Sequence, residues 1–267
     1  MRKYKLGVIG AGFMATAIVK GVINSNVLSA SEIIVSDPNQ ASLDKMQVLN
    51  VATTSNNAEL VNCSEYVLFA VKPQSLDVVL DGISTCNCGK FISIMAGVKK
   101  DKIKKVFPSA LVARCMPNTP CAIGSGAVGL DVSDFLNEEE QLFIKTLFSS
   151  LAEVVFVEEE KLNAVTGISG SAPAYFYLFL KGIIDAGVKH GLSVEQAKSL
   201  ATATMIGAGK MVEQNPEKSI DELIFAVCSK GGTTIEAVNV FNTDGLNSLT
   251  ERAIDACVKR SKELEKL

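Results

Sequence analysis

The chain has 267 residues, of which 48% are hydrophobic, and a formal net charge of −3 at pH 7. Its Lys residues are scattered among acids and form no basic face, so nucleic acid is not an expected partner. The chain has no run of about 18 apolar residues and no signal-type segment at its start, so we expect a cytoplasmic protein without membrane contact. The seven Cys residues form no C-x-x-C pair, which argues against a disulfide framework and against a bound metal.

A glycine-rich turn over residues 10–15 follows the first expected strand, residues 6–9. Gly10 permits a tight strand-to-helix turn, Gly12 lets the backbone approach a pyrophosphate, and Ala15 allows the helix and strand to pack closely. The helix expected next offers free N–H groups and a positive dipole end to the phosphates. The segment therefore predicts a dinucleotide site, and a glycine turn without a ligand is the alternative.

Short apolar strands alternate with helical stretches up to about residue 157, which predicts a parallel sheet covered on both faces. The expected strands are 6–9, 32–35, 66–71, 91–95, 111–115, 127–130 and 154–157, and helix-like windows include 39–49 and 138–151. The strand pattern stops after three consecutive glutamates at 158–160. We therefore predict an α/β fold with an N-terminal Rossmann dinucleotide-binding domain, residues 1–158, followed by an all-helical domain, residues 159–267.

The second half has a helical pattern throughout. Helices are expected over about 160–190, 193–213, 219–227, 233–241 and 245–265. Ser193 and Gln196 have the spacing of a capping box. The helices over 172–184 and 200–209 are apolar on more than one face and need cover on several sides, so we expect two subunits to interdigitate. A self-contained helical bundle is the alternative.

In a doubly wound sheet, ligands bind beyond the carboxyl ends of the strands. The residues at these positions are 36–37, 70–74, 95–98 and 114–120. Asp37 ends the second expected strand, where an acid accepts hydrogen bonds from the adenosine ribose and repels a 2′-phosphate, so it favours NADH over NADPH. The alternative is that Asp37 only begins an Asp-Pro turn.

Two glycine- and hydroxyl-rich stretches, residues 166–175 and 228–234, stand out in the helical half. Each places Ser or Thr and free N–H groups at an expected helix start, an arrangement suited to a carboxylate. Helix capping explains either stretch alone, but together with a dinucleotide site they favour a small anionic substrate.

Acid–base side chains are scarce. His190 is the only histidine, and because it precedes Gly191 we expect it to lie at a helix C-terminus and not to act as an acid or base. Hydride transfer to an already protonated imine needs little acid–base help and fits this scarcity.

These motifs together resemble the pyrroline-5-carboxylate reductase family over essentially the whole chain. The segments that carry the resemblance are 9–18, 70–74, 93–98, 114–120, 162–175 and 227–238. The resemblance implies a Rossmann domain followed by a helical domain that interlocks two subunits, with dimers often assembled into larger rings. It also implies reduction of the imino acid 1-pyrroline-5-carboxylate to L-proline, the last step of proline biosynthesis, with a hydride from NADPH or NADH.

The resemblance further implies which residues form the site. Thr166 is the implied hydrogen-bond partner of the imine nitrogen. The implied cofactor-binding residues are Gly10, Gly12, Phe13, Met14, Ala15, Ser36, Asp37, Asn57, Ala70, Val71, Lys72, Pro73, Met95, Ala96, Gly97 and Asn118. The implied substrate-binding residues are Ser171, Val227, Ser229, Gly231, Gly232, Thr233 and Thr234, of which those from Ser229 onward hold the carboxylate.

The chain departs from the family pattern in places. Lys230 stands where the family usually has Pro, and this extra cation favours an acidic substrate; Ala172 stands where Gly is usual. Other functions stay open. Reductases of β-hydroxyacids share this architecture but need a Lys early in the first helix after the linker, where the first Lys here is Lys181. Reduction of another cyclic imine is a second alternative, and a dinucleotide-binding redox sensor without catalysis is a third.

Overall fold

The computed structural model describes residues 2–266. They form two compact units, one reaching to Ser171 and including the residues from Cys257 onward, the other Ala172–Ala256. By their contacts, residues 159–171 therefore pack with the first unit, whereas the sequence pattern places a boundary after residue 158. That boundary stays a prediction.

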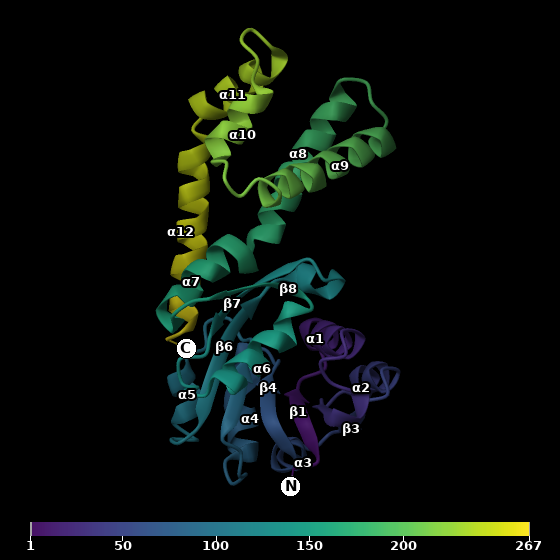
Figure 1. Ribbon diagram of the computed structural model, residues 1–267, viewed down its shortest axis with the longest axis vertical. Coiled ribbons are helices and arrows are strands. Elements are labelled where there is room, and N and C mark those ends of the chain that lie inside the picture. The colour runs from purple at the N-terminus through teal and green to yellow at the C-terminus, as the bar shows by residue number, and fades with distance from the viewer. Residues whose placement is uncertain (1, 267) are drawn as a thin grey trace. The chain divides into compact units, whose positions relative to one another are not determined.

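An eight-stranded sheet forms the centre of the first unit, in the order β3-β2-β1-β4-β5-β6-β7-β8 (Figure 1). The strands are β1 (Tyr4–Ile9), β2 (Ile33–Ser36), β3 (Ala52–Thr54), β4 (Ser64–Phe69), β5 (Lys90–Ser93), β6 (Leu111–Pro117), β7 (Gly126–Asp131) and β8 (Ala152–Phe156). The order 3-2-1-4-5-6 is that of the Rossmann fold, which confirms the predicted fold class. All seven expected strands are present, and β3 is an additional one.

The sheet is not parallel throughout, which corrects the expectation from the sequence. β7 pairs antiparallel with β6, with Arg114 opposite Asp131, and β8 runs parallel to β7. Only residues 118–125 connect β6 to β7, and a parallel pairing needs a crossover of about a dozen residues or more. The short connection therefore makes the strand turn back.

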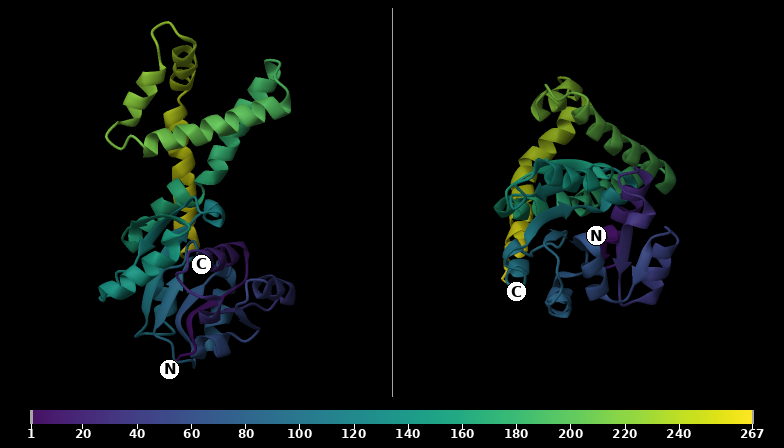
Figure 2. Two further views of the ribbon diagram at one scale, coloured as in Figure 1. Left: turned by 45° about the vertical axis from the view of Figure 1, so that its right-hand side comes forward. Right: turned by 60° about the horizontal axis from the view of Figure 1, so that its bottom comes forward.

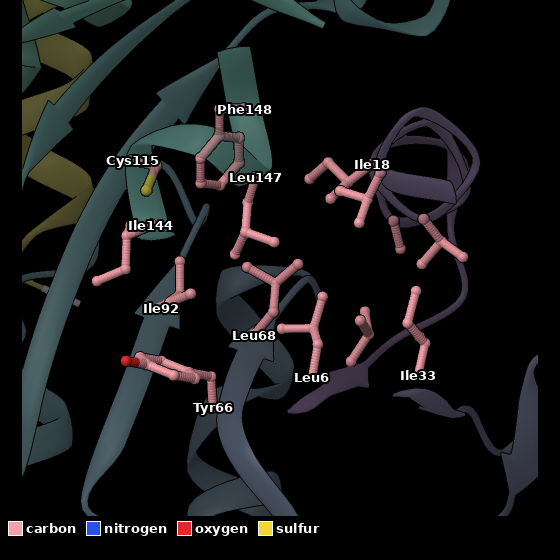
Figure 3. Close-up of a cluster of buried hydrophobic side chains, with 14 of the residues drawn as sticks. Leu6, Ile18, Ile33, Tyr66, Leu68, Ile92, Cys115, Ile144, Leu147 and Phe148 are labelled. Atoms are coloured by element: carbon pink, nitrogen blue, oxygen red, sulfur yellow. The ribbon is translucent and has the colours of Figure 1, made fainter. Parts of the chain in front are cut away.

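Helices cover both faces of the sheet, as predicted. They are α1 (Phe13–Asn24), α2 (Gln40–Gln47), α3 (Asn57–Cys63), α4 (Leu76–Ile83), α5 (Lys100–Lys104), α6 (Glu138–Ser149) and α7 (Leu162–Val165). One buried cluster joins strand residues such as Leu6 and Leu68 to Ile18 of α1 and Leu147 of α6 (Figure 3). A second cluster packs α3, α4 and α5 on the other face. Because both faces are covered, the strands are apolar nearly throughout, as their sequence shows.

The segment from residue 160 to 190 is not the single continuous helix that its sequence predicts. After α7 it makes one π-helical turn, Thr166–Gly170, and then continues as α8 (Ala172–Lys189). A Cβ on Gly170 would lie 2.5 Å from Cε of Met116, so this turn packs closely against β6. π-helical turns are rare and frequently mark functional sites.

The second unit is helical, and its helices are drawn in green to yellow in Figure 2. They are α8, α9 (Val194–Glu213), α10 (Ile220–Val227), α11 (Thr233–Thr243) and the first part of α12 (Leu246–Leu264). The predicted capping box is confirmed: Gln196 N donates to Ser193 Oγ at 3.2 Å, and Ser193 N donates to Gln196 Oε1 at 2.9 Å. His190 follows α8 directly and precedes Gly191, whose φ is +95°.

Large apolar side chains of the second unit are exposed in the single chain. Leu178 is 73% exposed, Phe225 78% and Leu200 60%. Among the described residues, no helix is long and apolar enough to cross a membrane. The exposed apolar residues therefore agree with the expectation that another subunit covers these helices.

Candidate active site

The two glycines of the turn after β1 have different environments. Gly10 has φ +104°, and a Cβ there would lie 2.7 Å from the carbonyl oxygen of Ala70. A Cβ on Gly12, the N-cap of α1, would meet nothing within 4 Å. Gly10 is therefore required by the fold itself, whereas Gly12 faces open space at a helix N-terminus, where a pyrophosphate would bind.

Asp37 lies against this turn. Its Oδ2 accepts a hydrogen bond from Ala11 N at 2.8 Å, and its Oδ1 accepts one from Asn39 N at 2.9 Å. The second contact is the Asp-Pro turn that the sequence left open as the alternative. The carboxylate thus starts the turn and also reaches the glycine segment, and its contact with a ribose stays a prediction.

Two other predicted cofactor residues, Ser36 at the end of β2 and Asn57 at the start of α3, contact each other. Ser36 is fully buried, and its Oγ donates to Oδ1 of Asn57 at 2.6 Å. Gly10 N donates to the carbonyl oxygen of Ser36 at 2.7 Å. The structure therefore brings Gly10, Ser36, Asp37 and Asn57 together at one edge of the sheet. The remaining residues of the turn, Phe13, Met14 and Ala15, begin α1.

The next predicted segments follow β4 and β5. Ala70 N donates to the carbonyl oxygen of Ile9 at 2.9 Å, which holds the segment Ala70–Pro73 beside the glycine turn. After β5, Met95 is buried, Ala96 follows, and Gly97 has φ +68°. A Cβ on Gly97 would lie 2.6 Å from Cβ of Leu264, because the last turn of α12 packs directly against this glycine.

Asn118 joins three segments through its side chain. It is 9% exposed, and its Nδ2 donates to the carbonyl oxygen of Ser169 at 3.3 Å. Its Oδ1 accepts from Ala127 N at 3.0 Å. The carboxamide thus connects the end of β6 to β7 and to the π-helical turn.

Thr166 begins that turn. Its Oγ1 donates to the carbonyl oxygen of Leu162 at 2.9 Å, so its proton is engaged and its lone pairs can accept a hydrogen bond. Oγ of Ser169 is buried without a hydrogen-bond partner among the described residues. Ser171 Oγ accepts a hydrogen bond from Sγ of Cys257 at 3.3 Å. The turn therefore gathers three hydroxyl groups within six residues.

The predicted carboxylate loop belongs to the second unit. Val227 ends α10, and Gly231 has φ +71°. Gly232 is the N-cap of α11, and a Cβ on it would lie 2.3 Å from Oγ of Ser229. No side chain caps the helix, so its first N–H groups, at Thr233 and Thr234, are available to an anion.

Two buried cysteines, Cys115 and Cys121, lie on β6 and in the segment that follows it. Burial raises the pKa of the Cys115 thiol well above its ordinary value, and burial also raises the pKa of Cys121, so neither forms a thiolate readily. Among the described residues, no group of three or more His, Cys, Asp and Glu side chains is placed to hold a metal ion.

A buried ionic cluster near the site was not foreseen. Arg114 NH1 lies 3.1 Å from Glu265 Oε1 and 3.3 Å from Glu159 Oε1. These residues are up to 151 positions apart in the sequence. No local pattern relates them, and only the single arginine within an apolar strand hinted at a buried partner.

The comparisons with known proteins cover the whole chain. Residues 159–264 match the family model for pyrroline-5-carboxylate reductase dimerisation, and residues 5–97 match that for NADP oxidoreductase, coenzyme F420-dependent. The chain is 37% identical to pyrroline-5-carboxylate reductase of Haemophilus influenzae, with 100% of both chains covered.

Solved structures give the same result. A pyrroline-5-carboxylate reductase from Coxiella burnetii has a TM-score of 0.91 at 30% identity, with 100% of both chains covered. The pyrroline carboxylate reductase of Plasmodium falciparum, with NADP bound, has a TM-score of 0.86 at 28% identity, with 99% of both chains covered. The resemblance seen in the sequence is thereby confirmed, and the chain belongs to the pyrroline-5-carboxylate reductase family.

Proposed function

We propose that this chain is an NAD(P)H-dependent oxidoreductase that reduces 1-pyrroline-5-carboxylate to L-proline, the last step of proline biosynthesis. The observation that carries the proposal is similarity to reductases of this name along the full length of both chains. The dinucleotide, when bound, supplies the hydride.

The residues of the first unit fit such a dinucleotide. Gly12 leaves open space beside the N-terminus of α1, so the pyrophosphate would be held by the first N–H groups of that helix. Ser36, Asp37 and Asn57 would contact the adenosine side, and residues 95–97 with Asn118 the nicotinamide side. Both NADPH and NADH are compatible with this site, and the carboxylate of Asp37 gives a slight preference for NADH.

Thr166 would orient the substrate by accepting a hydrogen bond from the protonated imine nitrogen. This role is supported by the bond from its Oγ1 to the carbonyl oxygen of Leu162, which leaves the oxygen free to accept. Such a contact matters most when it stabilises the transition state more than the bound substrate. For Thr166 to donate a proton to the substrate, its hydrogen bond to the carbonyl oxygen of Leu162 would have to break.

The loop with Ser229, Gly231, Gly232, Thr233 and Thr234 would hold the substrate carboxylate, with Ser171 and Val227 as further contacts. The uncapped start of α11 supports this assignment, because unpaired N–H groups and the positive helix end attract an anion. Lys230 is exposed in this loop, and its charge would draw an acidic substrate toward it.

The helical residues 159–264 match the family model for dimerisation, so the protein is a homo-oligomer. We propose a dimer formed through these helices, with dimers assembled into a larger ring. We also propose that the enzyme acts in the cytoplasm. All seven cysteines are free, which suits a reducing compartment.

The test is the oxidation of NADH and NADPH by the purified protein with 1-pyrroline-5-carboxylate, with other cyclic imines and with β-keto acids. Turnover confined to 1-pyrroline-5-carboxylate supports the proposal. Turnover only with another imine or with a keto acid would reject this substrate, and dinucleotide binding without any turnover would favour a sensor.

A further inference from the structure

We propose that Glu265, directly after α12, is a positioning residue that holds the nicotinamide-side loop, residues 95–97, and the segment before Thr166 through a buried cluster with Arg114. The inference rests on the proposed dinucleotide site, but not on the identity of the substrate. All residues in the cluster belong to the first unit.

The cluster is centred on one carboxylate oxygen. Oε1 of Glu265 accepts hydrogen bonds from NH1 and NH2 of Arg114 at 3.1 and 3.2 Å, and from Nδ2 of Asn163 at 3.1 Å. Ser261 Oγ in turn donates to Oδ1 of Asn163 at 2.6 Å. The side chains of Arg114 and Glu265 are only 4% and 8% exposed. Removing one partner therefore leaves largely buried polar groups without a hydrogen bond that they make in the intact cluster.

The cluster reaches the loop after β5 in two ways. Leu264 precedes Glu265 and packs against Gly97, where a Cβ would lie 2.6 Å from Cβ of Leu264. Glu159, which also contacts Arg114, accepts a hydrogen bond from the backbone N–H of Lys100 at 2.8 Å. The loop is thus held at Gly97 and again three residues later.

Two members of the cluster are also close in sequence to Thr166 and Asn118, the residues assigned to the imine and the nicotinamide. Asn163 is on α7, three residues before Thr166. Arg114 is on β6, four residues before Asn118. Fixing Asn163 and Arg114 to one carboxylate therefore constrains the segments that carry Thr166 and Asn118 relative to the loop at Gly97.

A structural role alone does not account for this arrangement well. The sheet is already held by two apolar clusters on its faces, to which none of these polar residues belongs. Buried ion pairs contribute weakly to stability compared with apolar packing, but they demand one geometry. Because a displacement of about 1 Å can cost about a hundredfold in rate, such geometry matters most beside reacting atoms.

The experiment compares Glu265→Ala and Glu265→Gln with a matched control, Lys90→Met. Gln keeps an Oε1 that can accept from Arg114 and Asn163. Lys90 begins β5 and pairs with Glu65 and Glu140 at the opposite end of that strand from Gly97, so its loss removes ion pairs without touching the site. The dissociation constant of NADPH is measured for each variant from the fluorescence of NADPH. The rate of amide hydrogen exchange at residues 95–97 is measured separately in the dinucleotide-free protein.

We expect Glu265→Ala to weaken NADPH binding about tenfold and to speed exchange at 95–97, and Glu265→Gln to restore most of the affinity. Lys90→Met should lower the melting temperature but leave the dissociation constant unchanged. The proposal is overturned if Glu265→Ala binds NADPH within about twofold of the wild type, if Gln restores nothing, or if Lys90→Met weakens binding equally.

If Glu265→Ala does not fold, Ser261→Ala replaces it, because this variant keeps every charge and removes only the hydrogen bond to Asn163. Its NADPH affinity should then fall about threefold, and an unchanged affinity would overturn the proposal. Since binding is measured without an imine, a chain that proves to reduce another substrate leaves this test intact.

Discussion

The carboxylate of Asp37 accepts a hydrogen bond from the backbone N–H of Ala11 at 2.8 Å, so the end of β2 is tied directly to the glycine turn after β1. We also expect this carboxylate to accept hydrogen bonds from the adenosine ribose of the cofactor. If this prediction holds, a single carboxylate shapes the turn and also sets the charge where NADPH and NADH differ.

Asp37→Ser should raise kcat/KM for NADPH relative to NADH about tenfold, because the repulsion of a 2′-phosphate is removed. The measurement is steady-state kinetics with both cofactors. Asp44→Ser is the control, since Asp44 is exposed on α2 and its Oδ1 accepts a hydrogen bond from the side chain of Gln40. An unchanged cofactor ratio in Asp37→Ser would mean that Asp37 does not face the ribose.

Gly10→Ala should lower the stability of the protein, whereas Gly12→Ala should weaken its binding of NADPH. Ala at position 10 would adopt φ +104° against the carbonyl oxygen of Ala70, so we expect a loss of at least about 2 kcal/mol in the free energy of unfolding. Ala at position 12 meets no atom of the chain, so stability should stay near wild type while NADPH binding weakens at least tenfold. Urea unfolding and NADPH titration separate the two, and normal NADPH binding by Gly12→Ala would reject the pyrophosphate assignment.

Much of this organisation could be predicted because its signals are local. The glycine turn, the capping box at Ser193 and the seven longer strands each appear within about ten consecutive residues. β3 was missed because Ala52–Thr54 is too short and too polar to show a period. The turn at Thr166–Gly170 was expected to be part of one helix, since an apolar helical pattern continues through it.

The site could be predicted only where it lies in such local motifs. Gly10, Ser36, Asp37 and Asn57 are together in the structure, and their contact with a dinucleotide stays a prediction. The contacts of Glu265 with Arg114 and Asn163 join residues 151 and 102 positions apart, and no periodicity or motif connects them. Long-range packing decides these contacts.

Thr166→Ala should lower kcat at least tenfold and change KM for 1-pyrroline-5-carboxylate less, because the proposed contact acts mainly in the transition state. Thr166→Ser keeps a hydroxyl and should recover most of kcat. Both are measured at saturating cofactor. If kcat of Thr166→Ala equals that of the wild type, Thr166 has no part in the mechanism.

Asp134 should make the stability of the first unit depend on acid pH. Burial opposes ionisation of Asp134, but hydrogen bonds from Lys104, Val112 N and Lys100 lower its pKa below the ordinary value. A carboxylate with a lowered folded pKa contributes stability above its unfolded pKa of about 3.9 and loses it as the pH falls through the folded value.

Asp134→Asn should therefore lower the free energy of unfolding by about 1–2 kcal/mol at pH 7, and the difference from wild type should shrink below about pH 4. Urea unfolding at pH 7, 5 and 3.5 measures it. A difference that stays constant down to pH 3.5, or that grows in acid, would contradict a lowered pKa for Asp134 in the folded protein.

The most direct test of the central claim is the amount of L-proline formed per NAD(P)H oxidised when the purified protein is mixed with 1-pyrroline-5-carboxylate. The account predicts one L-proline for each cofactor molecule oxidised. NAD(P)H oxidation without L-proline, or no oxidation with this imine while another imine or keto acid is reduced, would contradict it.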